Sequence, residues 1–231
     1  MDYSVHFLPT KLDYQVQLSD PREMAAIGKP AVRPLTSRGA ATRLRIVQAA
    51  ADLIYSRGVD RTSLDEVMAR SGVSKSQLYH YFADKEALVL DVIALQTERI
   101  LGAQQPHVAA LDSLAALRAW RNTIIRLNKE VRAGGCPLGS LANELANNST
   151  GARKHLAKGF ETWTDCIERG LTAMRDRGEL VPGADPHELA IALLSAVQGG
   201  LLLAKTTKSG RALEIALDVA IDHVASLMRK S

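Results

Sequence analysis

The chain has 231 residues, of which 46% are hydrophobic and 23% are charged, and its formal net charge is +4 at pH 7. This size suits one compact domain or a small domain joined to a larger one, and a modest basic excess permits contact with DNA phosphates without requiring it. Two cysteines are too few for a disulfide framework or a four-ligand zinc site, so we expect a reducing compartment and no metal.

Residues 1–37 show no sustained hydrophobic period and contain four prolines. We predict a flexible N-terminal arm here, and Met24 is an alternative start of the natural chain. The arm either has no function or touches DNA beside the main site, as basic arms of other helical DNA-binding modules do. Lys29, Arg33 and Arg38 are the basic residues available for such a contact.

From Arg43 onward the apolar residues recur at helical intervals, and almost no segment alternates with the period of two typical of strands. We therefore predict an all-α fold. The expected helices span residues 39–57, 63–70, 74–81, 84–104, 111–132, 137–147, 151–177, 186–204 and 211–229. The longest apolar stretch, 190–204, is interrupted by Ser195 and Gln198 and is too short to span a bilayer, so we expect a cytoplasmic protein.

Residues 62–86 contain a helix, a turn marked by glycine and a second short helix. Ser63 can cap the first helix while Glu66 reaches back to the Ser63 amide, which is the capping-box pattern. Gly72 can adopt the left-handed conformation that closes the first helix, and Ser74 is placed to cap the second. Spacing alone would also fit an ordinary helical hairpin. The polar, basic and aromatic side chains of the second helix favour insertion into the major groove of DNA.

Residues 62–88 resemble the N-terminal signature of the TetR/AcrR family of transcriptional repressors, and the match extends from about Arg43 to Leu90. They read Thr-Ser-Leu-Asp-Glu-Val-Met-Ala-Arg-Ser-Gly-Val-Ser-Lys-Ser-Gln-Leu-Tyr-His-Tyr-Phe-Ala-Asp-Lys-Glu-Ala-Leu. The resemblance implies a three-helix DNA-binding domain at residues 38–84 and a helical ligand-binding and dimerisation domain at residues 85–231. It also implies a homodimeric repressor that binds a palindromic DNA operator and is released by a small-molecule effector.

The first turn of the second helix, residues 74–77, can reach base edges in the major groove. Lys75 would favour the acceptor atoms of guanine, and Gln77 would favour adenine. Ser76 departs from the glycine that relatives often carry at this position, and the change can alter base preference without abolishing binding.

The remaining contacts follow from the family pattern. It implies that Tyr79, Tyr81 and Lys85 touch phosphates, which set affinity and register rather than sequence preference. The alternative for Tyr79 is a core ring with its hydroxyl at the surface, and the alternative for His80 is a solvated side chain. The full set of expected DNA-contacting residues is Arg43, Thr62, Ser74, Lys75, Ser76, Gln77, Tyr79, His80, Tyr81 and Lys85.

The last two expected helices carry broad apolar faces. Two adjacent C-terminal helices of this kind suggest a four-helix interface with the same pair in a second subunit. The alternative is that these faces only close the core of one subunit. The expected dimerisation residues are Leu189, Leu193, Leu194, Val197, Leu201, Val219, Val224 and Leu227.

A helical body with apolar and aromatic residues between its helices can enclose a ligand. The body lacks a concentrated set of inward carboxylates, so an apolar, aromatic or weakly polar effector is favoured over a polycation. The candidate lining residues, each of which could instead be ordinary core, are Trp120, Leu141, Phe160, Trp163, Met174 and Gln198.

Cys136 is the most distinctive candidate in the body. Pro137 fits the first position of a helix, which places Cys136 at the cap, where unpaired amides and the helix dipole stabilise a thiolate. We therefore expect a depressed thiol pKa and increased nucleophilicity. The segment also resembles the Gly-Cys-x-x-Gly stretch of a TetR subgroup that includes electrophile, oxidant and flavonoid sensors, and this implies a sensing role. The alternative is a buried, inert thiol.

Catalysis is the rival of a different class. A thiol-dependent enzyme using Cys136 would need a base, and nothing in the sequence fixes His155 beside the thiol. No Gly-rich phosphate loop or His-x-x-x-His pair appears, so we expect no cofactor and no enzymatic activity. A transcriptional activator of the same fold is the second alternative, because residues do not reveal the sign of regulation.

Overall fold

The computed structural model describes residues 36–130 and 134–229. Contacts divide the chain into two units, Met1–Leu44 and Arg45–Ser231. The described part of the first unit is the beginning of a single helix, and every other helix belongs to the second unit. Most of the predicted N-terminal arm, residues 1–35, lies outside the described residues.

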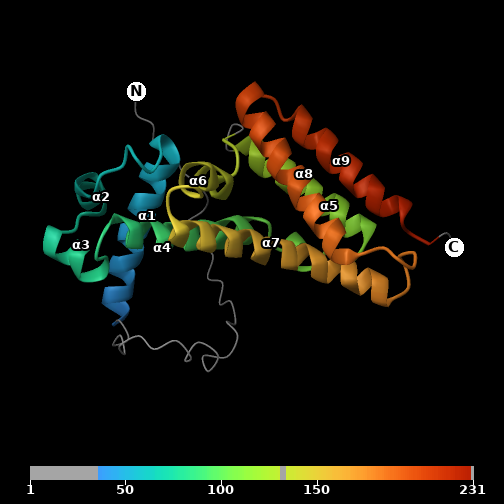
Figure 1. Cartoon of the computed structure of the whole chain (residues 1–231), viewed down its shortest axis with the longest axis horizontal. Helices are drawn as coiled ribbons and strands as arrows, with labels where there is room; N and C mark the ends of the chain where they lie inside the picture. Colours follow the sequence, from blue (N-terminus) through green and yellow to red (C-terminus); the bar gives the residue numbers. More distant parts are fainter. Residues whose placement is uncertain (1–35, 131–133, 230–231) are drawn as a thin grey trace. The chain divides into compact units, whose positions relative to one another are not determined.

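Helices make up nearly all the regular structure of the described residues (Figure 1). In chain order they are α1 (Ser37–Arg57), α2 (Leu64–Ser71), α3 (Lys75–Tyr81), α4 (Lys85–Ala103), the 3₁₀ helix η2 (His107–Ala109), α5 (Leu114–Glu130), α6 (Pro137–Leu145), α7 (Thr150–Asp176), α8 (Pro186–Thr207) and α9 (Arg211–Ser226). The only bridge of β type in this part of the chain is an isolated antiparallel pair, Leu180 and Met228. The prediction of an all-α fold is confirmed.

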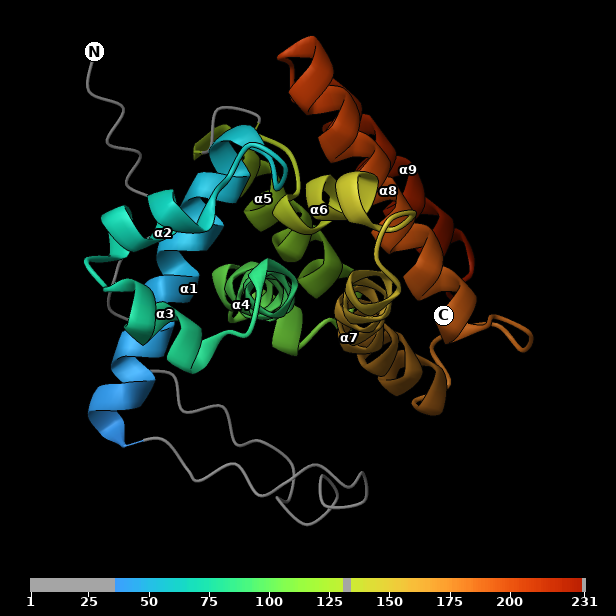
Figure 2. The same ribbon diagram turned by 60° about the vertical axis from the view of Figure 1, so that its left-hand side comes forward.

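The helices of the second unit pack against one another (Figure 2). α8 packs most extensively against α9 and also against α7, while α7 packs against α4 and α9 against α5. Leu213, Leu217, Ile221 and Val224 recur every three or four residues along α9, and all four are buried. They form the stripe by which α9 joins the body.

Among the described helices, α8 alone is long and apolar enough to cross a membrane, yet 44% of its apolar window is buried inside the fold. It packs against helices on two sides, α7 and α9. A helix that is apolar around most of its circumference is typical of a buried core position. Packing within the bundle therefore accounts for the buried part of the apolar surface of α8.

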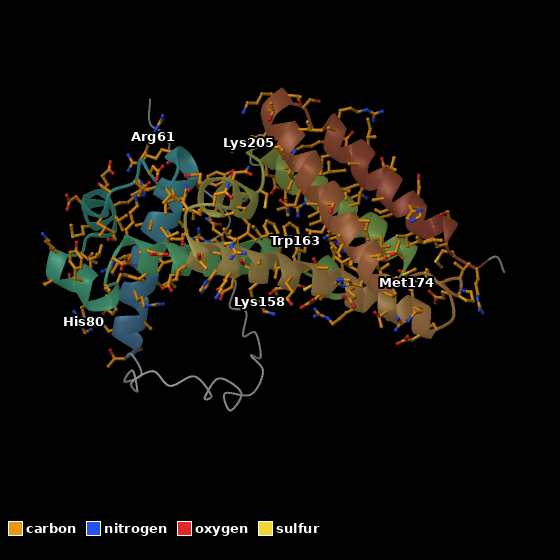
Figure 3. All side chains as sticks on the ribbon, viewed as in Figure 1. Arg61, His80, Lys158, Trp163, Met174 and Lys205 are labelled. Carbon is orange, nitrogen blue, oxygen red and sulfur yellow. The ribbon has the colours of Figure 1, made fainter. Side chains whose placement is uncertain are left out.

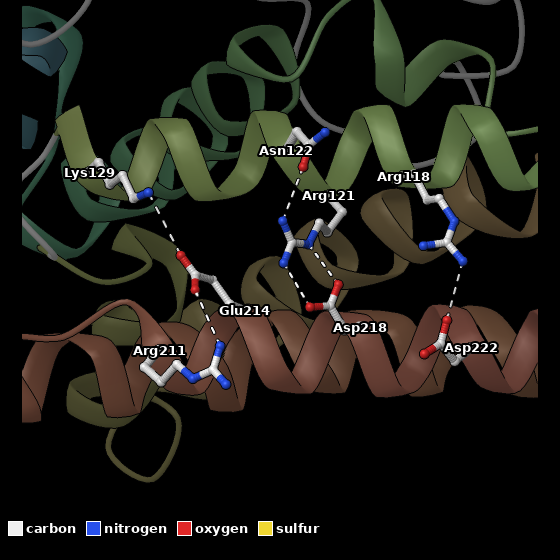
Figure 4. A network of polar contacts seen from close by, with 8 residues as sticks. All are labelled: Arg118, Arg121, Asn122, Lys129, Arg211, Glu214, Asp218 and Asp222. Carbon is white, nitrogen blue, oxygen red and sulfur yellow. Dashed lines mark hydrogen bonds and ion pairs between the residues drawn. The ribbon is translucent and has the colours of Figure 1, made fainter.

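A ladder of ion pairs joins α5 to α9 (Figure 4). At its centre, Arg121 binds Asp218 with two parallel hydrogen bonds, Nε to Oδ1 at 2.9 Å and Nη2 to Oδ2 at 2.8 Å. Arg118 lies 3.3 Å from Asp222. On the other side of the centre, Lys129 lies 3.7 Å from Glu214. Because the three acidic residues are spaced by four along α9, they present one charged edge to α5.

We predict that Arg121→Met lowers the free energy of unfolding by about 1 kcal/mol, because the pair with Asp218 is bidentate and charge-assisted. The Arg121 side chain is only 22% exposed, whereas Arg118 and Asp222 are 59% and 66% exposed. The matched change Arg118→Met should therefore have almost no effect. Urea unfolding followed by circular dichroism measures both, and equal losses in the two variants would contradict the ranking.

Candidate DNA-binding helix and sensing region

The first helix of the predicted DNA-binding motif is closed at both ends as its sequence indicates. The Ser63 amide donates to Glu66 Oε2 at 2.9 Å, and the Glu66 amide donates to Ser63 Oγ at 3.3 Å. The hydrogen bonds from Ser63 hold the pKa of Glu66 below its ordinary value. At the other end Gly72 has φ +66° and donates its amide to Met68 O. This left-handed residue lets the chain turn at once into α3.

The second helix, α3, has a capping box of its own. The Ser74 amide donates to Gln77 Oε1 at 2.9 Å, and the Gln77 amide donates to Ser74 Oγ at 3.3 Å. Bidentate reading of adenine needs that same amide oxygen of Gln77. The geometry therefore assigns Gln77 a capping role, and the Ser-x-x-Gln spacing is the signal that could have revealed it.

The rest of α3 presents polar and aromatic side chains to solvent. Leu78 and Phe82 are 0% and 2% exposed and fix the inner face of the helix. Tyr79 is 47% exposed, which excludes the core alternative for its ring. His80, labelled in Figure 3, is exposed as well, and its ring meets the ring of Tyr81 edge-on at 4.9 Å between centroids. Lys75, Ser76 and Ser74 are exposed in the first turn.

Two of the predicted DNA contacts are instead used within the chain. Thr62 is 2% exposed, and its hydroxyl donates to Gly58 O at 2.9 Å. Lys85 Nζ donates to Val59 O at 2.7 Å. Both side chains therefore hold the loop between α1 and α2, and the buried hydroxyl of Thr62 is not available to DNA. The expectation for Thr62 as a DNA contact is wrong because tertiary packing buries it.

Arg43 and Arg45 belong to different units of the chain. Arg43 is half-buried in the part of α1 that precedes Arg45. Arg45 Nε donates to Ser71 O at 2.9 Å and so joins α1 to the carboxyl end of α2. Sequence reasoning missed this role, since an arginine on an exposed helical face carries no signal of a specific carbonyl partner.

Cys136 caps α6 as predicted, but its environment is not the one expected. The Gly139 amide donates to Sγ at 3.4 Å, and Pro137 occupies the first turn. The thiol is nevertheless buried, and burial raises its pKa above the ordinary value. Hydrogen bonds from the Gly139 and Leu138 amides lower the pKa by less. The predicted depressed pKa is therefore wrong, because desolvation of a thiolate outweighs the helix cap.

The candidate lining residues fall into two groups. Trp120 and Met174 are fully buried core, and the Trp120 indole N–H donates to Gln104 Oε1 at 2.8 Å. By contrast, the indole N–H of Trp163 and the amide nitrogen of Gln198 are buried without a hydrogen-bond partner of acceptable geometry in the described part of the chain. Unpartnered buried donors of this kind are costly unless something else satisfies them.

Gln198 lies next to the cap of α6. A Cβ placed on Gly139 would come within 3.1 Å of Gln198 Oε1 and 3.5 Å of Cys136 Cβ. Leu141 is 3% exposed, and Phe160 is partly buried against the core. Cys136 and Gln198 therefore both lie close to Gly139 of α6. Leu141 of the same helix lines a hollow of about 10 Å³, the size of one water molecule, between α6, α1 and α4.

The predicted dimerisation residues are mostly inside the chain. Leu189, Leu193, Leu194, Val197, Leu201 and Val224 are all buried, so these six cannot meet a second subunit. Val219 is 64% exposed, and Leu227 is partly buried. The large aliphatic side chains that α8 and α9 do expose are Ile191, Leu202, Leu203, Ile215 and Val219.

The raised pKa of Cys136 predicts slow alkylation at neutral pH. In a Cys166→Ser background, iodoacetamide should react with the folded protein far more slowly at pH 7 than with the urea-unfolded protein, and the rate for the folded protein should level off at a higher pH than the rate for the unfolded protein. Because the folded thiol holds its proton more tightly, its contribution to stability is complete below the unfolded pKa and is lost as pH rises through the folded pKa. Equal rates of Cys136 alkylation in the folded and unfolded protein would contradict a raised pKa.

Comparison with known proteins agrees with the geometry. Residues 46–92 match the family described as bacterial regulatory proteins, tetR family, and residues 110–220 match the tetracyclin repressor-like C-terminal domain. An HTH-type transcriptional regulator of Lactococcus lactis is 30% identical over 77% of this chain and 90% of its own length. The A-factor receptor protein of Streptomyces griseus is 27% identical over 76% of this chain and 59% of its own length.

A solved TetR regulator from Chloroflexus aurantiacus has a TM-score of 0.72 with this chain, at 23% identity, and covers 85% of it and 100% of the solved chain. The shared fold, the two family matches and the capped helix-turn-helix lead to one conclusion. The chain belongs to the TetR family of bacterial transcriptional regulators.

Proposed function

We propose that the protein is a dimeric repressor that binds a palindromic operator and releases it when a small apolar or aromatic effector binds. Members of this family bind DNA and small-molecule effectors and act as dimers. The observation that carries the proposal is α3, a short helix capped at its start, anchored by Leu78 and Phe82, and exposing a basic and aromatic face. We expect such a protein in the cytoplasm, where its DNA is.

In this proposal two copies of α3 enter successive major grooves, roughly 34–36 Å apart. Lys75 is the base reader, since an exposed amine in the first turn can reach the acceptor atoms of guanine. Ser74 and Ser76 flank it, with their hydroxyl oxygens 3.1 Å apart. Tyr79 and His80 touch phosphates and set the register.

The dimer interface is the outer side of α8 and α9. These helices expose five large aliphatic side chains, Ile191, Leu202, Leu203, Ile215 and Val219, which a soluble monomer would leave in water. Pairing the two helices with their copies around a twofold axis gives a four-helix interface that covers them. The ladder from α5 holds α9 along an edge next to this exposed face.

The effector site is the region around the start of α6. The buried donors of Trp163 and Gln198 lack partners within the described residues, so an effector with hydrogen-bond acceptors on an aromatic frame would satisfy them. A thiol-reactive effector is the alternative input. It would have to open the site first, because Cys136 is buried and its pKa is raised.

Activation rather than repression is the second candidate for the direction of control. Expression of a reporter placed behind the operator, in cells with and without the protein, separates the two. Higher expression without the protein supports repression.

We predict that Lys75→Met lowers affinity for the preferred operator about tenfold or more, because a base contact of this kind contributes ~1–3 kcal/mol of discrimination. Affinity for unrelated DNA should fall much less. Tyr79→Phe, which removes only a hydroxyl, should weaken binding to both DNAs by a similar factor. Fluorescence anisotropy with DNA from the upstream region of the gene measures both.

The control is Lys158→Met on α7, which also removes one exposed lysine (Figure 3). It should leave operator affinity nearly unchanged. Equal losses from Lys75→Met and Lys158→Met would show that only net charge matters and would contradict the reading role of α3.

We predict that Val219→Glu converts the dimer to a monomer, because a buried unpaired carboxylate at the interface is strongly unfavourable. Operator affinity should fall with it, since one half-site remains unoccupied. Sedimentation velocity gives the mass directly. Ala157→Glu, at an exposed position of α7, adds the same single negative charge and should stay dimeric. A dimeric Val219→Glu protein would place the interface elsewhere.

A further inference from the structure

The backbone of Val59, in the loop between α1 and α2, is hydrogen-bonded through both its N–H and its C=O. Its N–H donates to Glu144 Oε2 of α6 at 2.7 Å. Its carbonyl accepts from Lys85 Nζ of α4 at 2.7 Å. Val59 is 6% exposed as a whole residue, and both bonds are partly shielded from water, so its backbone groups gain from these charged partners. The first bond ties a helix of the ligand-binding body to the DNA-binding domain.

The glycine before Val59 leaves room for the Glu144 carboxylate. Gly58 has φ +89°, and a Cβ at this position would lie only 2.9 Å from Glu144 Oε2. Any larger residue would therefore meet both backbone strain and the carboxylate itself. Within the body, the Ser149 hydroxyl at the start of α7 donates to Glu86 Oε1 of α4 at 2.6 Å.

From this loop the path to α3 is short. The Thr62 amide donates to Val59 O, and the Thr62 hydroxyl donates to Gly58 O. Ser63, the next residue, is the cap of α2. A shift of Val59 therefore moves the start of α2, which is joined to α3 through the turn at Gly72.

The opposite end of α6 lies in the proposed effector region. Cys136 caps the helix, and Gly139 packs against Gln198. α6 has nine residues, so its ends are about 13 Å apart at 1.5 Å per residue. A short helix moves as one body. Displacement at the Cys136 end is thus delivered to Glu144.

We propose that Glu144 is a positioning residue that latches the α1–α2 loop to α6 in the DNA-binding conformation, and that an effector releases DNA by breaking this latch. The inference rests on the proposed function. A hydrogen bond of 2.7 Å to a carboxylate is strong, yet it is lost when its atoms separate by about 1 Å more. A small shift of α6 is therefore enough to break the latch.

The direction of the effect follows from the two states. The bond stabilises only the DNA-binding conformation, so its removal shifts the population toward the released one. Glu144→Ala should lower operator affinity about tenfold, given the strength of a hydrogen bond to a charged group. Glu144→Gln keeps an acceptor oxygen, so its operator affinity should lie between those of Glu144→Ala and the wild type.

Because the effector is unidentified, the test uses a bulky substitution at the Cys136 end of α6 in its place. Gly139→Val places a branched side chain against Gln198 and Cys136 and should push α6 outward. Its effect on operator affinity is measured in the wild-type and Glu144→Ala backgrounds by fluorescence anisotropy. Hydrogen exchange of the Val59 amide is followed in the wild type, the two single variants and the double variant. Glu161→Ala, at an exposed position of α7, is the control.

The latch predicts non-additive effects. Gly139→Val should weaken operator binding and speed Val59 exchange in the wild-type background, and should add little once Glu144 is replaced. Exchange in α8 and α9 should stay unchanged, which a general loss of stability would not allow. Additive losses, or wild-type affinity and exchange in both Glu144 variants, would overturn the latch while leaving the repressor intact. Failure of the unsubstituted protein to bind any DNA would overturn the proposed function as well.

Discussion

Backbone donors and acceptors that are withdrawn from water must be satisfied, and at Val59 the N–H and the C=O are bound by charged side chains of two other helices. Lys85 belongs to α4 and Glu144 to α6, so the loop that precedes the helix-turn-helix is fixed by elements on which the ligand-binding body is built. Much of the account follows from this arrangement. These two bonds help to fix the loop, the loop leads into α2, and α2 is joined to α3 through the turn at Gly72.

The local features were predictable from sequence because their causes are local. The capping box of α2 and the left-handed Gly72 follow from residue types a few positions apart, and the helix periods predicted the all-α fold. The features that depend on tertiary contacts were not. Glu144 reaches a loop 85 positions away, and burial reverses the expected pKa of Cys136. Neither the Glu144 contact nor the burial of Cys136 can be read from the spacing of residue types in the sequence.

The α8 and α9 helices show why hydrophobic periodicity alone does not predict which apolar side chains are buried. Leu201 is buried while its neighbours Leu202 and Leu203 are exposed, and all three have the same chemistry. A helix that is apolar around most of its circumference offers more than one stripe, and sequence alone does not say which one faces a second subunit. The buried stripe serves the chain's own core, and the exposed stripe is the one left for a partner.

The central claim is that a pair of α3 helices recognises a symmetric DNA site. Footprinting of the purified protein on DNA fragments from its genome tests this directly. The account predicts a protected site with two half-sites of inverted sequence, their centres one helical turn or a multiple of it apart. Uniform protection without sequence preference, or no protection in any fragment at low salt, would contradict it.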